Sequence, residues 1–296
     1  MGVGAPPSYK RQDLAGGGGI LPTPGGRVSL LSKNRCTPPI FPRMTGISAF
    51  IVCKNEAASI ERCLASLSWC DEIVVVDSGS TDATLEICAR HNCRITHREW
   101  SGYVEQKSHA LSLCTQPWIF NLDADEEVSP ELRDEIRSML ERDGRGQVTE
   151  EGFEILRVVF YLGRWWRRGG WHPERRLRLA RRERVTWHGE EPHEHARVRG
   201  AVGRMRGELR HYTYRDIADH VARLNAHSSV AARALHAKGV RAGLVDLLIK
   251  PKARFLKFFF LRRGYREGLP GLLVACMEGF YVFLKYFKLW ELGRRG

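Results

Sequence analysis

Strand-like segments alternate with helical patterns along the first half of the chain. The segment at 73–76 holds only β-branched residues, which is typical of a strand buried on both faces of a sheet. The expected strands are 47–52, 73–76, 94–97 and 118–122. Between them, apolar residues recur at helical spacing through Leu64, through Cys88 and over 103–114. This alternation predicts an α/β fold with a mostly parallel sheet flanked by helices.

The pattern changes after a helix that reaches about Leu140 and a polar loop at 141–151. A strand is expected at 153–161, and the chain becomes helical from Tyr214 onward. The first 44 residues are rich in glycine and proline without a helical or strand period, which predicts a disordered tail or a mis-assigned start upstream of Met44. The expected units are a tail at 1–44, an α/β domain at 45–215 and an amphipathic helical region at 216–296.

Two segments near the C-terminus mix apolar and basic side chains. In 244–266 leucines and phenylalanines alternate with lysines and arginines, which is typical of a helix in a membrane interface or of an amphipathic helix packed on the main domain. The segment 269–290 is aromatic and bracketed by lysines. Its apolar stretch contains Glu278 and is too short to span a bilayer. We therefore expect a peripheral protein on an anionic membrane surface.

Charge and cysteine usage add two expectations. The formal net charge of +13 over 296 residues attracts nucleic acid, anionic lipid or phosphorylated small molecules, and charge alone does not choose among them. The eight cysteines are scattered through apolar segments with no C-x-x-C pair and no secretory signal. Reduced thiols and a cytoplasmic location are expected.

Polar residues follow the expected strands at their carboxyl ends. They are Asn55, Glu56, Asp77, Asp82, Asp123 and Asp125. In open α/β sheets ligands bind beyond this edge. Asp123 and Asp125 are separated by one residue, and we interpret them as a Mg²⁺ or Mn²⁺ site that holds a substrate diphosphate. The alternative is a solvated acidic loop before a helix that Ser129 caps.

The middle of the chain is strongly basic. Residues 157–210 contain fifteen arginines and six glutamates, with tryptophans among them. Guanidinium groups beside indole rings suit a sugar phosphate, although a solvated basic face has the same composition. Within this segment, 188–195 holds three histidines and three glutamates around Gly189 and Pro192. Such a loop favours one carboxylate acting as a general base over a zinc site.

Several short motifs together resemble the family 2 inverting glycosyltransferases with a GT-A fold. In chain order they are Cys53-Lys54-Asn55-Glu56, the segment 77–82, Gln106-Lys107 and the segment 122–126. Further segments are similar to the bacterial lipopolysaccharide core β-glucosyltransferases. They are 169–173, 176–179, 192–194 and 283–291. The resemblance covers residues 46 to about 292 and implies a nucleotide-sugar transferase.

The resemblance also implies roles for individual residues. Donor-nucleotide contacts fall on Lys54, Asn55, Glu56, Asp77, Ser78, Asp82, Lys107 and Asp123. The divalent cation falls on Asp123 and Asp125, and contacts to the diphosphate or the acceptor fall on Arg178, His193 and Trp171. The chain departs from the group in having His172-Pro173-Glu174 for a more usual Tyr-Pro-Asp, and in the acids Glu190 and Glu191. The base is therefore assigned to Glu194, with Glu191 and then Glu174 as alternatives.

The expected function is that of an inverting, metal-dependent hexosyltransferase. It moves a sugar, expected to be glucose, from a UDP-sugar to a lipopolysaccharide core or other lipid-linked acceptor at the inner face of the bacterial inner membrane. One alternative is a polyprenyl-phosphate glycosyltransferase, whose phosphate acceptor needs little help from a base. Another is a nucleic-acid-binding protein, but the chain has no recognisable reader motif and the acids at the strand ends would be unexplained. We therefore expect no nucleic-acid partner. The sequence does not determine the sugar, the acceptor or the linkage.

Overall fold

The structure is a computed structural model that describes residues 45–189 and 194–295. The expectations for residues 1–44 lie outside the described residues, as do those for Glu191 and His193. The strands are β1 (Ile47–Cys53), β2 (Glu72–Asp77), β3 (Arg94–His97), β4 (Trp118–Asp123), β5 (Glu126–Val128), β6 (Gly152–Tyr161), β7 (Arg164–Trp166), β8 (Glu174–Arg181), β9 (Val185–His188), β10 (His195–Val198) and β11 (Val202–His211). The α-helices are α1 (Ile60–Ser66), α2 (Thr84–Arg90), α3 (Tyr103–Leu113), α4 (Pro130–Gly144), α5 (Ile217–Ala237), α6 (Leu244–Leu256) and α7 (Leu269–Arg295).

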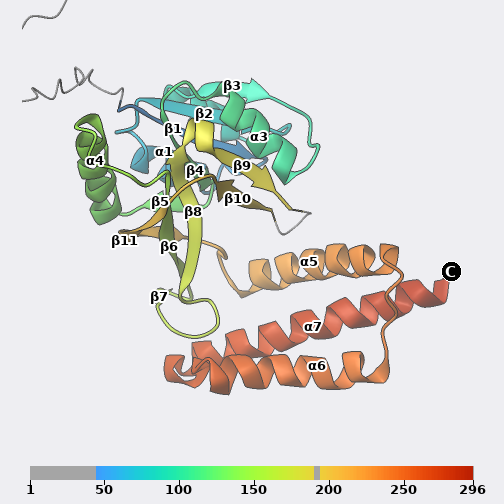
Figure 1. The fold of residues 1–296 in the computed structure, drawn as a ribbon. Helices are drawn as coiled ribbons and strands as arrows, with labels where there is room; N and C mark the ends of the chain where they lie inside the picture. The colour runs from blue at the N-terminus through green and yellow to red at the C-terminus, as the bar shows by residue number, and fades with distance from the viewer. Residues whose placement is uncertain (1–44, 190–193, 296) are drawn as a thin grey trace, which may run out of the picture. The chain divides into compact units, whose positions relative to one another are not determined.

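The described strands form one large mixed sheet and a separate β9–β10 hairpin (Figure 1). The order in the large sheet is β3-β2-β1-β4-β8-β6-β11-β5, with β7 paired to β6. The first four strands are parallel, as expected. The expectation of a mostly parallel sheet is wrong, because β8 runs antiparallel to both β4 and β6. The chain turns back after Tyr161 through β7 without a crossover helix, and such a return makes neighbouring strands antiparallel.

The sheet buries side chains on both faces. Along β1, Ile51 packs in a core cluster with residues of α1 and α4, whereas Phe50 packs in a second cluster with residues of α3. This alternation follows from the two-residue period of a strand. It explains why β1 and β4 read as nearly continuous apolar runs in the sequence.

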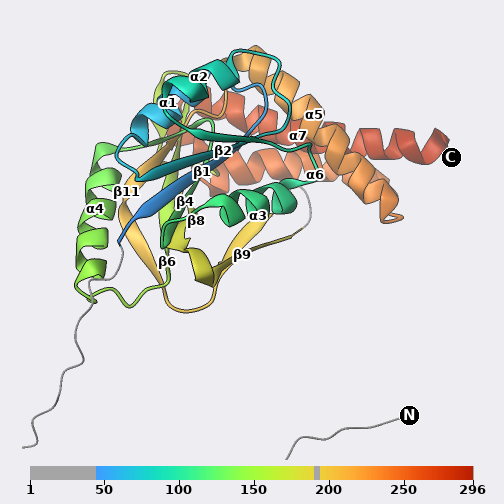
Figure 2. The same cartoon turned by 90° about the horizontal axis from the view of Figure 1, so that it is seen from above.

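The C-terminal helices pack together and contact the end of the sheet. Both α5 and α6 lie against α7 (Figure 2). An aromatic cluster joins Tyr161 and Trp166 at the end of β6 and in β7 to Phe258, which follows α6, and to Val274 of α7. Within residues 45–189 and 194–295, no helix has the length and apolar character needed to cross a bilayer.

Candidate active site

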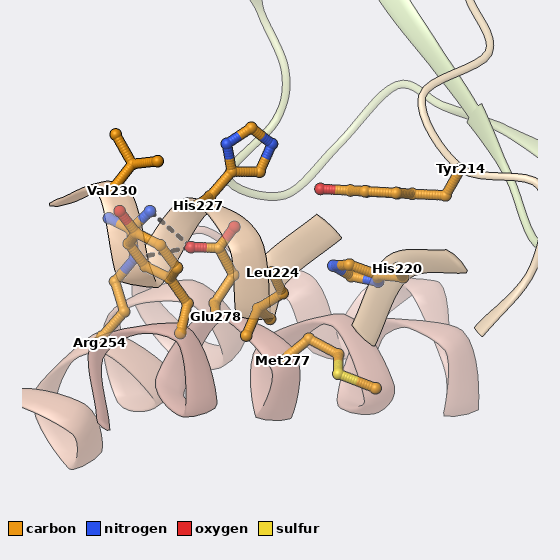
Figure 3. Close-up of a pocket in the computed structure, with 9 residues that line it drawn as sticks. Tyr214, His220, Leu224, His227, Val230, Arg254, Met277 and Glu278 are labelled. Atoms are coloured by element: carbon orange, nitrogen blue, oxygen red, sulfur yellow. Dashed lines mark hydrogen bonds and ion pairs between the residues drawn. The ribbon is translucent and has the colours of Figure 1, made fainter. Parts of the chain in front are cut away.

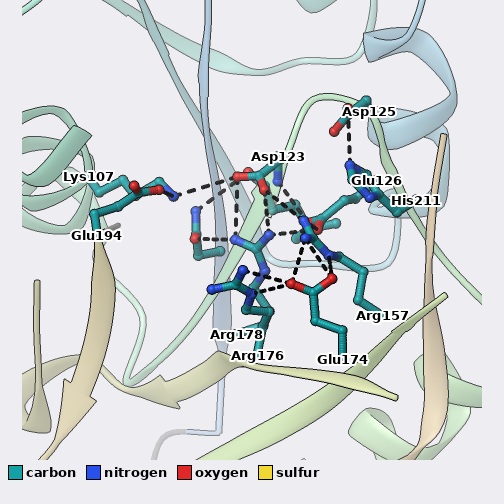
Figure 4. A network of polar contacts seen from close by, with 12 residues as sticks. Lys107, Asp123, Asp125, Glu126, Arg157, Glu174, Arg176, Arg178, Glu194 and His211 are labelled. Carbon is teal, nitrogen blue, oxygen red and sulfur yellow. Dashed lines mark hydrogen bonds and ion pairs between the residues drawn. The ribbon is translucent and has the colours of Figure 1, made fainter. Parts of the chain in front are cut away.

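The two acids of the D-x-D motif face different partners. Strand β4 ends at Asp123, the chain turns, and β5 begins at Glu126. The Asp123 carboxylate points toward Lys107 and Arg178, whereas Asp125 points toward His211 (Figure 4). Helix α4 begins directly afterwards, with Ser129 as its N-cap and Pro130 at its first turn. The expected helix start is confirmed, and the acids before it are held by specific partners.

Asp123 lies among three cations. Its Oδ2 is 2.5 Å from Nη2 of Arg178 and 3.8 Å from Nη1 of Arg157, and its Oδ1 is 3.6 Å from Nζ of Lys107. Although burial alone would raise it, the charges of Arg178 and Lys107 hold the pKa of Asp123 well below its ordinary value. This carboxylate is therefore ionised, and the cations around it are close enough to one another to share an anionic ligand.

A β-bulge lies at Arg178. Phe153 pairs with Leu179 and the next residue, Glu154, pairs with Leu177, so Arg178 is the extra residue on β8. Bulges re-aim side chains, and this one places the Arg178 guanidinium against Asn121 and Asp123 of β4 and against Glu126. The contacts with Asp123 and Glu126 raise the pKa of Arg178 despite the opposing effect of burial.

Glu126 contacts both Asp123 and Arg178. Its side chain is fully buried, its Oε2 accepts a hydrogen bond from the Asp123 backbone N–H at 2.9 Å, and its Oε1 is 2.6 Å from Arg178. Arg157 of β6 bridges Glu126 and Glu174. The sequence alone indicates no role for Glu126 or Arg157. The position of Arg157 inside a strand, beside apolar neighbours, was the one available signal.

Asp125 and His211 form a pair with the chemistry of a metal site. Oδ2 of Asp125 is 3.2 Å from Nε2 of His211, and Nδ1 of His211 lies 2.7 Å from the Thr213 hydroxyl. Two metal ligands that meet a cation at right angles, each about 2.1 Å from it, lie about 3 Å from each other. The distance between the Asp125 and His211 atoms matches this spacing. A hydrogen bond at the second ring nitrogen is how ligating histidines are oriented. His211 was missed in the sequence, although it too ends a strand.

The fit to a divalent cation is therefore carried by two residues. Among the residues that the structure describes, no group of three or more histidine, cysteine or acidic side chains is arranged to hold a metal ion. Asp125 and His211 can supply two ligands, and phosphate oxygens and water commonly supply the rest at such sites. Asp123 faces Arg178 and Lys107 instead.

Glu194, the expected base, lies in the same pocket as Asp123. Its Oε1 is 3.1 Å from Nζ of Lys107, which is itself buried on α3. The pocket has a volume of about 280 Å³. Its charged lining residues are Lys107, Asp123, Glu154, Arg157, Arg175, Arg176, Arg178 and Glu194. The pocket thus brings together residues that are distant in the chain. They come from α3, β4, β6, β8 and the position directly before β10.

Two buried donors in the pocket lining have no hydrogen-bond partner within the described part of the chain. They are Nε of Arg178 and Nε1 of Trp187. A buried donor without an acceptor is costly, so both atoms favour a ligand that carries oxygen acceptors.

Glu174, the third candidate for the base, forms ion pairs with Arg157 and Arg176, whereas Glu194 is paired with Lys107. Despite burial, Arg157 keeps the pKa of Glu174 below its ordinary value.

The expected nucleotide-binding residues form a hydrogen-bonded loop pair after β1 and β2. Asn55 has a positive φ of 57°, and its side-chain oxygen accepts from the Thr81 N–H. Asp82 accepts from the Ala57 N–H. Lys54 is exposed, Glu56 has a pKa raised mainly by burial, and Ser78 accepts from Gln106. The loops are therefore held together by their own polar groups.

Asp77 is used to hold the turn that follows β2. The whole residue is 1% exposed, and its Oδ2 accepts from the N–H groups of Gly79 and Ser80. Although burial would raise it, hydrogen bonds from the Ser80 hydroxyl and these N–H groups keep the pKa of Asp77 below its ordinary value. In this arrangement the Asp77 carboxylate stabilises the backbone of the turn at Gly79 and Ser80.

Trp171 lies outside the pocket that holds Glu194. It packs on Trp166, Tyr214 and Phe258, and its Nε1 donates to Glu278 of α7 at 3.0 Å. Glu278 also lines a second cavity of about 330 Å³ among the C-terminal helices (Figure 3). There its carboxylate is paired with Arg254 at 2.5 Å. That cavity holds none of the expected site residues.

Comparison with known proteins identifies the family of this chain. Residues 48–200 match the family model described as Glycosyl transferase family 2. The chain is similar to the lipopolysaccharide core biosynthesis glycosyltransferase LpsC of Rhizobium meliloti, with 32% identity over 254 residues, which cover 83% of this chain and 92% of that protein. It is also similar to an uncharacterized glycosyltransferase of Rickettsia typhi, with 31% identity over 84% of this chain and 88% of that protein.

Solved structures are more distant. Staphylococcus aureus TarS 1–349 in complex with UDP-GlcNAc has a TM-score of 0.42 and 12% identity over 85% of this chain and 92% of that one. Glucosyl-3-phosphoglycerate synthase from Mycobacterium tuberculosis, in complex with Mn²⁺ and UDP, has a TM-score of 0.32 and 24% identity over 40% and 44% of the two chains. At this level of similarity the ligands of those structures are not assigned to this chain. The match to the family model and the similarity to these glycosyltransferases show that the chain belongs to glycosyl transferase family 2.

Proposed function

We propose that this glycosyltransferase moves glucose from a UDP-sugar to a lipopolysaccharide core or other lipid-linked glycan acceptor, with inversion at the anomeric carbon. The observation that carries the proposal is the pocket in which Glu194 and Asp123 share the Lys107 ammonium, with Arg157 and Arg178 beside them. The similarity to a lipopolysaccharide core biosynthesis glycosyltransferase of Rhizobium supports the acceptor class. We place the reaction at the cytoplasmic, inner face of the bacterial inner membrane.

The charges of the pocket suit the departure of a nucleoside diphosphate. Lys107, Arg157 and Arg178 would neutralise negative charge that develops on the leaving group. A divalent cation, when bound, would add further positive charge there; Asp125 and His211 would hold it, with Asp123 close by. The loop that begins at Lys54 after β1 and the loop that reaches Asp82 after β2 would bind the nucleoside.

Glu194 is the proposed general base. Its carboxylate would accept the proton of the acceptor hydroxyl as that oxygen bonds to the anomeric carbon and the nucleoside diphosphate leaves from the opposite side. The ion pair with Lys107 fixes one carboxylate oxygen at 3.1 Å and leaves the other for the acceptor. Glu191 is proposed as the alternative to Glu194 for the base, and His193 as an orienting or acceptor-binding neighbour.

Substitution of the base tests the proposal. Glu194→Gln should lower the transfer rate by about 10² to 10⁴-fold, because general base catalysis is lost, while UDP-sugar binding measured by calorimetry stays close to wild type. Glu154→Gln is the matched control, since this carboxylate lines the same pocket but pairs with Arg204. Full transfer by a folded Glu194→Gln variant, with Glu191→Gln inactive, would move the base to Glu191.

A phosphate acceptor is the second candidate. Arg175 and Arg176 line the pocket and are exposed, so a polyprenyl phosphate could enter beside them. A phosphate oxygen is already ionised and needs little help from Glu194. Transfer to polyprenyl phosphate that survives Glu194→Gln would favour this reading over a hydroxyl acceptor.

A further inference from the structure

The helix α6 and the turns after it expose a row of large apolar side chains. The row consists of Leu248, Ile249, Leu256, Phe260 and Leu261, and we call it the apolar row. Ile249 and Leu256 are seven residues apart in α6 and lie on one side of that helix, and Phe260 follows four residues later in a π-helical segment, Lys257–Leu261. Leu261 is 79% exposed and Phe260 is 55% exposed. Large apolar side chains grouped in this way mark a surface that has a partner.

The opposite side of α6 is already used for packing. Arg254 forms an ion pair with Glu278 of α7, Lys250 donates to the Tyr286 hydroxyl, and Phe258 is buried against Trp171. Docking onto the rest of the chain therefore accounts for one side of this amphipathic segment. It does not account for the apolar row, whose side chains are half or more exposed.

Five cations accompany the apolar row. They are Lys252, Lys257, Arg262, Arg263 and Arg266, which we call the cationic set. All five are exposed, and none forms an ion pair or side-chain hydrogen bond with any residue that the structure describes. Elsewhere in the chain arginines are commonly paired, as Arg157, Arg167 and Arg181 are. The unpaired charges therefore coincide with the exposed apolar side chains.

We infer that the apolar row and the cationic set together dock this protein on an anionic lipid bilayer. Leucine and phenylalanine side chains can enter the boundary between head groups and acyl chains, while lysines and arginines next to them reach anionic head groups. The segment would lie along the bilayer surface, with its charged side chains at the head groups. A nucleic acid would use the cationic set but gives no burial to the apolar row. The inference rests on this surface and not on the transfer reaction.

Vesicle sedimentation tests the inference on the full chain. The protein should sediment with phosphatidylcholine vesicles that contain phosphatidylglycerol and should remain in solution with pure phosphatidylcholine. The triple variant Lys252→Gln, Lys257→Gln, Arg262→Gln should bind the anionic vesicles about a hundredfold more weakly, since each cation near such a surface contributes about fivefold. The double variant Leu256→Gln, Phe260→Gln should also lose binding while keeping every charge.

A matched control removes the same charge elsewhere. Arg137→Gln, Arg142→Gln, Arg145→Gln alters three exposed arginines of α4 and its C-cap and should leave vesicle binding within about twofold. Equal loss in the control, or unchanged binding in the double variant, would show non-specific attraction and overturn the inference, as would tighter binding to duplex DNA than to the vesicles. Glu194→Gln should bind vesicles normally, so a failed transfer assay and a failed docking surface remain distinguishable.

Discussion

At the scale of single residues, the pocket is built from charges that hold one another in place. Asp123, Glu126 and Glu174 are each met by an arginine, and Glu194 is met by Lys107. Buried ion pairs of this kind add little net stability, because desolvation offsets much of their attraction. For the proposed reaction their value is preorganisation, since the cations would be in position before a diphosphate arrives.

The pair of Asp125 and His211 leads to a prediction about metal dependence. If they hold the cation, His211→Ala should greatly raise the Mn²⁺ concentration needed for half-maximal transfer. Thr213→Val removes a hydroxyl that lies 2.7 Å from Nδ1 and 3.3 Å from Nε2 of His211, and it should raise this Mn²⁺ concentration by about 10 to 100-fold. His236→Ala is the control, because His236 is an exposed histidine in the last turn of α5. An unchanged Mn²⁺ requirement in His211→Ala would remove these two residues from the proposed site.

Asp77 leads to a prediction about pH. Its pKa is lowered in the folded chain, so its stabilising effect is complete above its ordinary pKa of about 4 and is lost as the pH falls through the lower folded value. Asp77→Asn should lower the free energy of unfolding by about 1 to 3 kcal/mol at pH 7, because hydrogen bonds to the turn are weakened. The gap to wild type in urea unfolding should narrow below about pH 4.

The control for this comparison is Glu61→Gln, which changes an exposed carboxylate. It should stay within about 0.5 kcal/mol of wild type from pH 7 to pH 4. A gap for Asp77→Asn that is equally large at pH 3 and pH 7 would contradict the assignment of its stabilising effect to the ionised carboxylate.

At the scale of elements, irregularities in the strands position the site. The bulge in β8 places Arg178, and a second irregularity in β11, between Arg204 and Glu208, precedes His211 on the same strand. There the N–H groups of Arg206 and Gly207 donate to Glu135 of α4. Such breaks in register carry no clear mark in a sequence, because they depend on the partner strand.

Gly207 tests the importance of the β11 irregularity. A Cβ there would lie 2.4 Å from the Leu132 backbone of α4, so Gly207→Ala requires the strand or the helix to shift. We expect a loss of about 1 to 3 kcal/mol in the free energy of unfolding, measured by urea denaturation. Gly293→Ala in α7 is the control, since nothing lies within 4 Å of its added Cβ, and it should be neutral or stabilising. Equal stability of the two variants would contradict close packing at Gly207.

At the scale of the whole described chain, an aromatic cluster joins the end of the sheet to the C-terminal helices. Trp171 contacts Trp166 in β7 and Phe258 after α6, and it donates to Glu278 of α7. The sequence resemblance gave Trp171 a role in diphosphate or acceptor binding, and the structure gives its side chain structural contacts. Both roles can be separated by measurement.

Trp171→Ala should lower the free energy of unfolding by about 3 to 5 kcal/mol, because a large side chain is removed from a packed cluster. Trp171→Phe should lose less, since it keeps a ring and gives up the hydrogen bond to Glu278. We expect the KM for the acceptor to stay near wild type in Trp171→Phe at a temperature where the variant is folded. A KM that rises strongly without loss of stability would return Trp171 to the acceptor site.

The sequence predicted much of the first half of the fold, because its signals are local. The strand at 94–97 is confirmed without change, and the helix at 103–114 ends one residue earlier than expected. The order of β6, β8 and β11 was not predicted, since no strands were expected at 174–181 and 202–211, where arginines interrupt the apolar pattern. For the site, Asp123, Lys107, Arg178 and Glu194 were named in advance, whereas His211, Glu126 and Arg157 were not.

The sequence by itself determined the α/β class, the strand ends that carry acids, the amphipathic C-terminal segments and the family. These properties depend on residue type and spacing within short segments, which the chain carries in any conformation. Only the tertiary structure decided that Asp123 faces Arg178 while Asp125 faces His211, and that Glu194 meets Lys107. Those contacts join residues up to 87 positions apart, and the direction of each strand and its register determine which side chains meet.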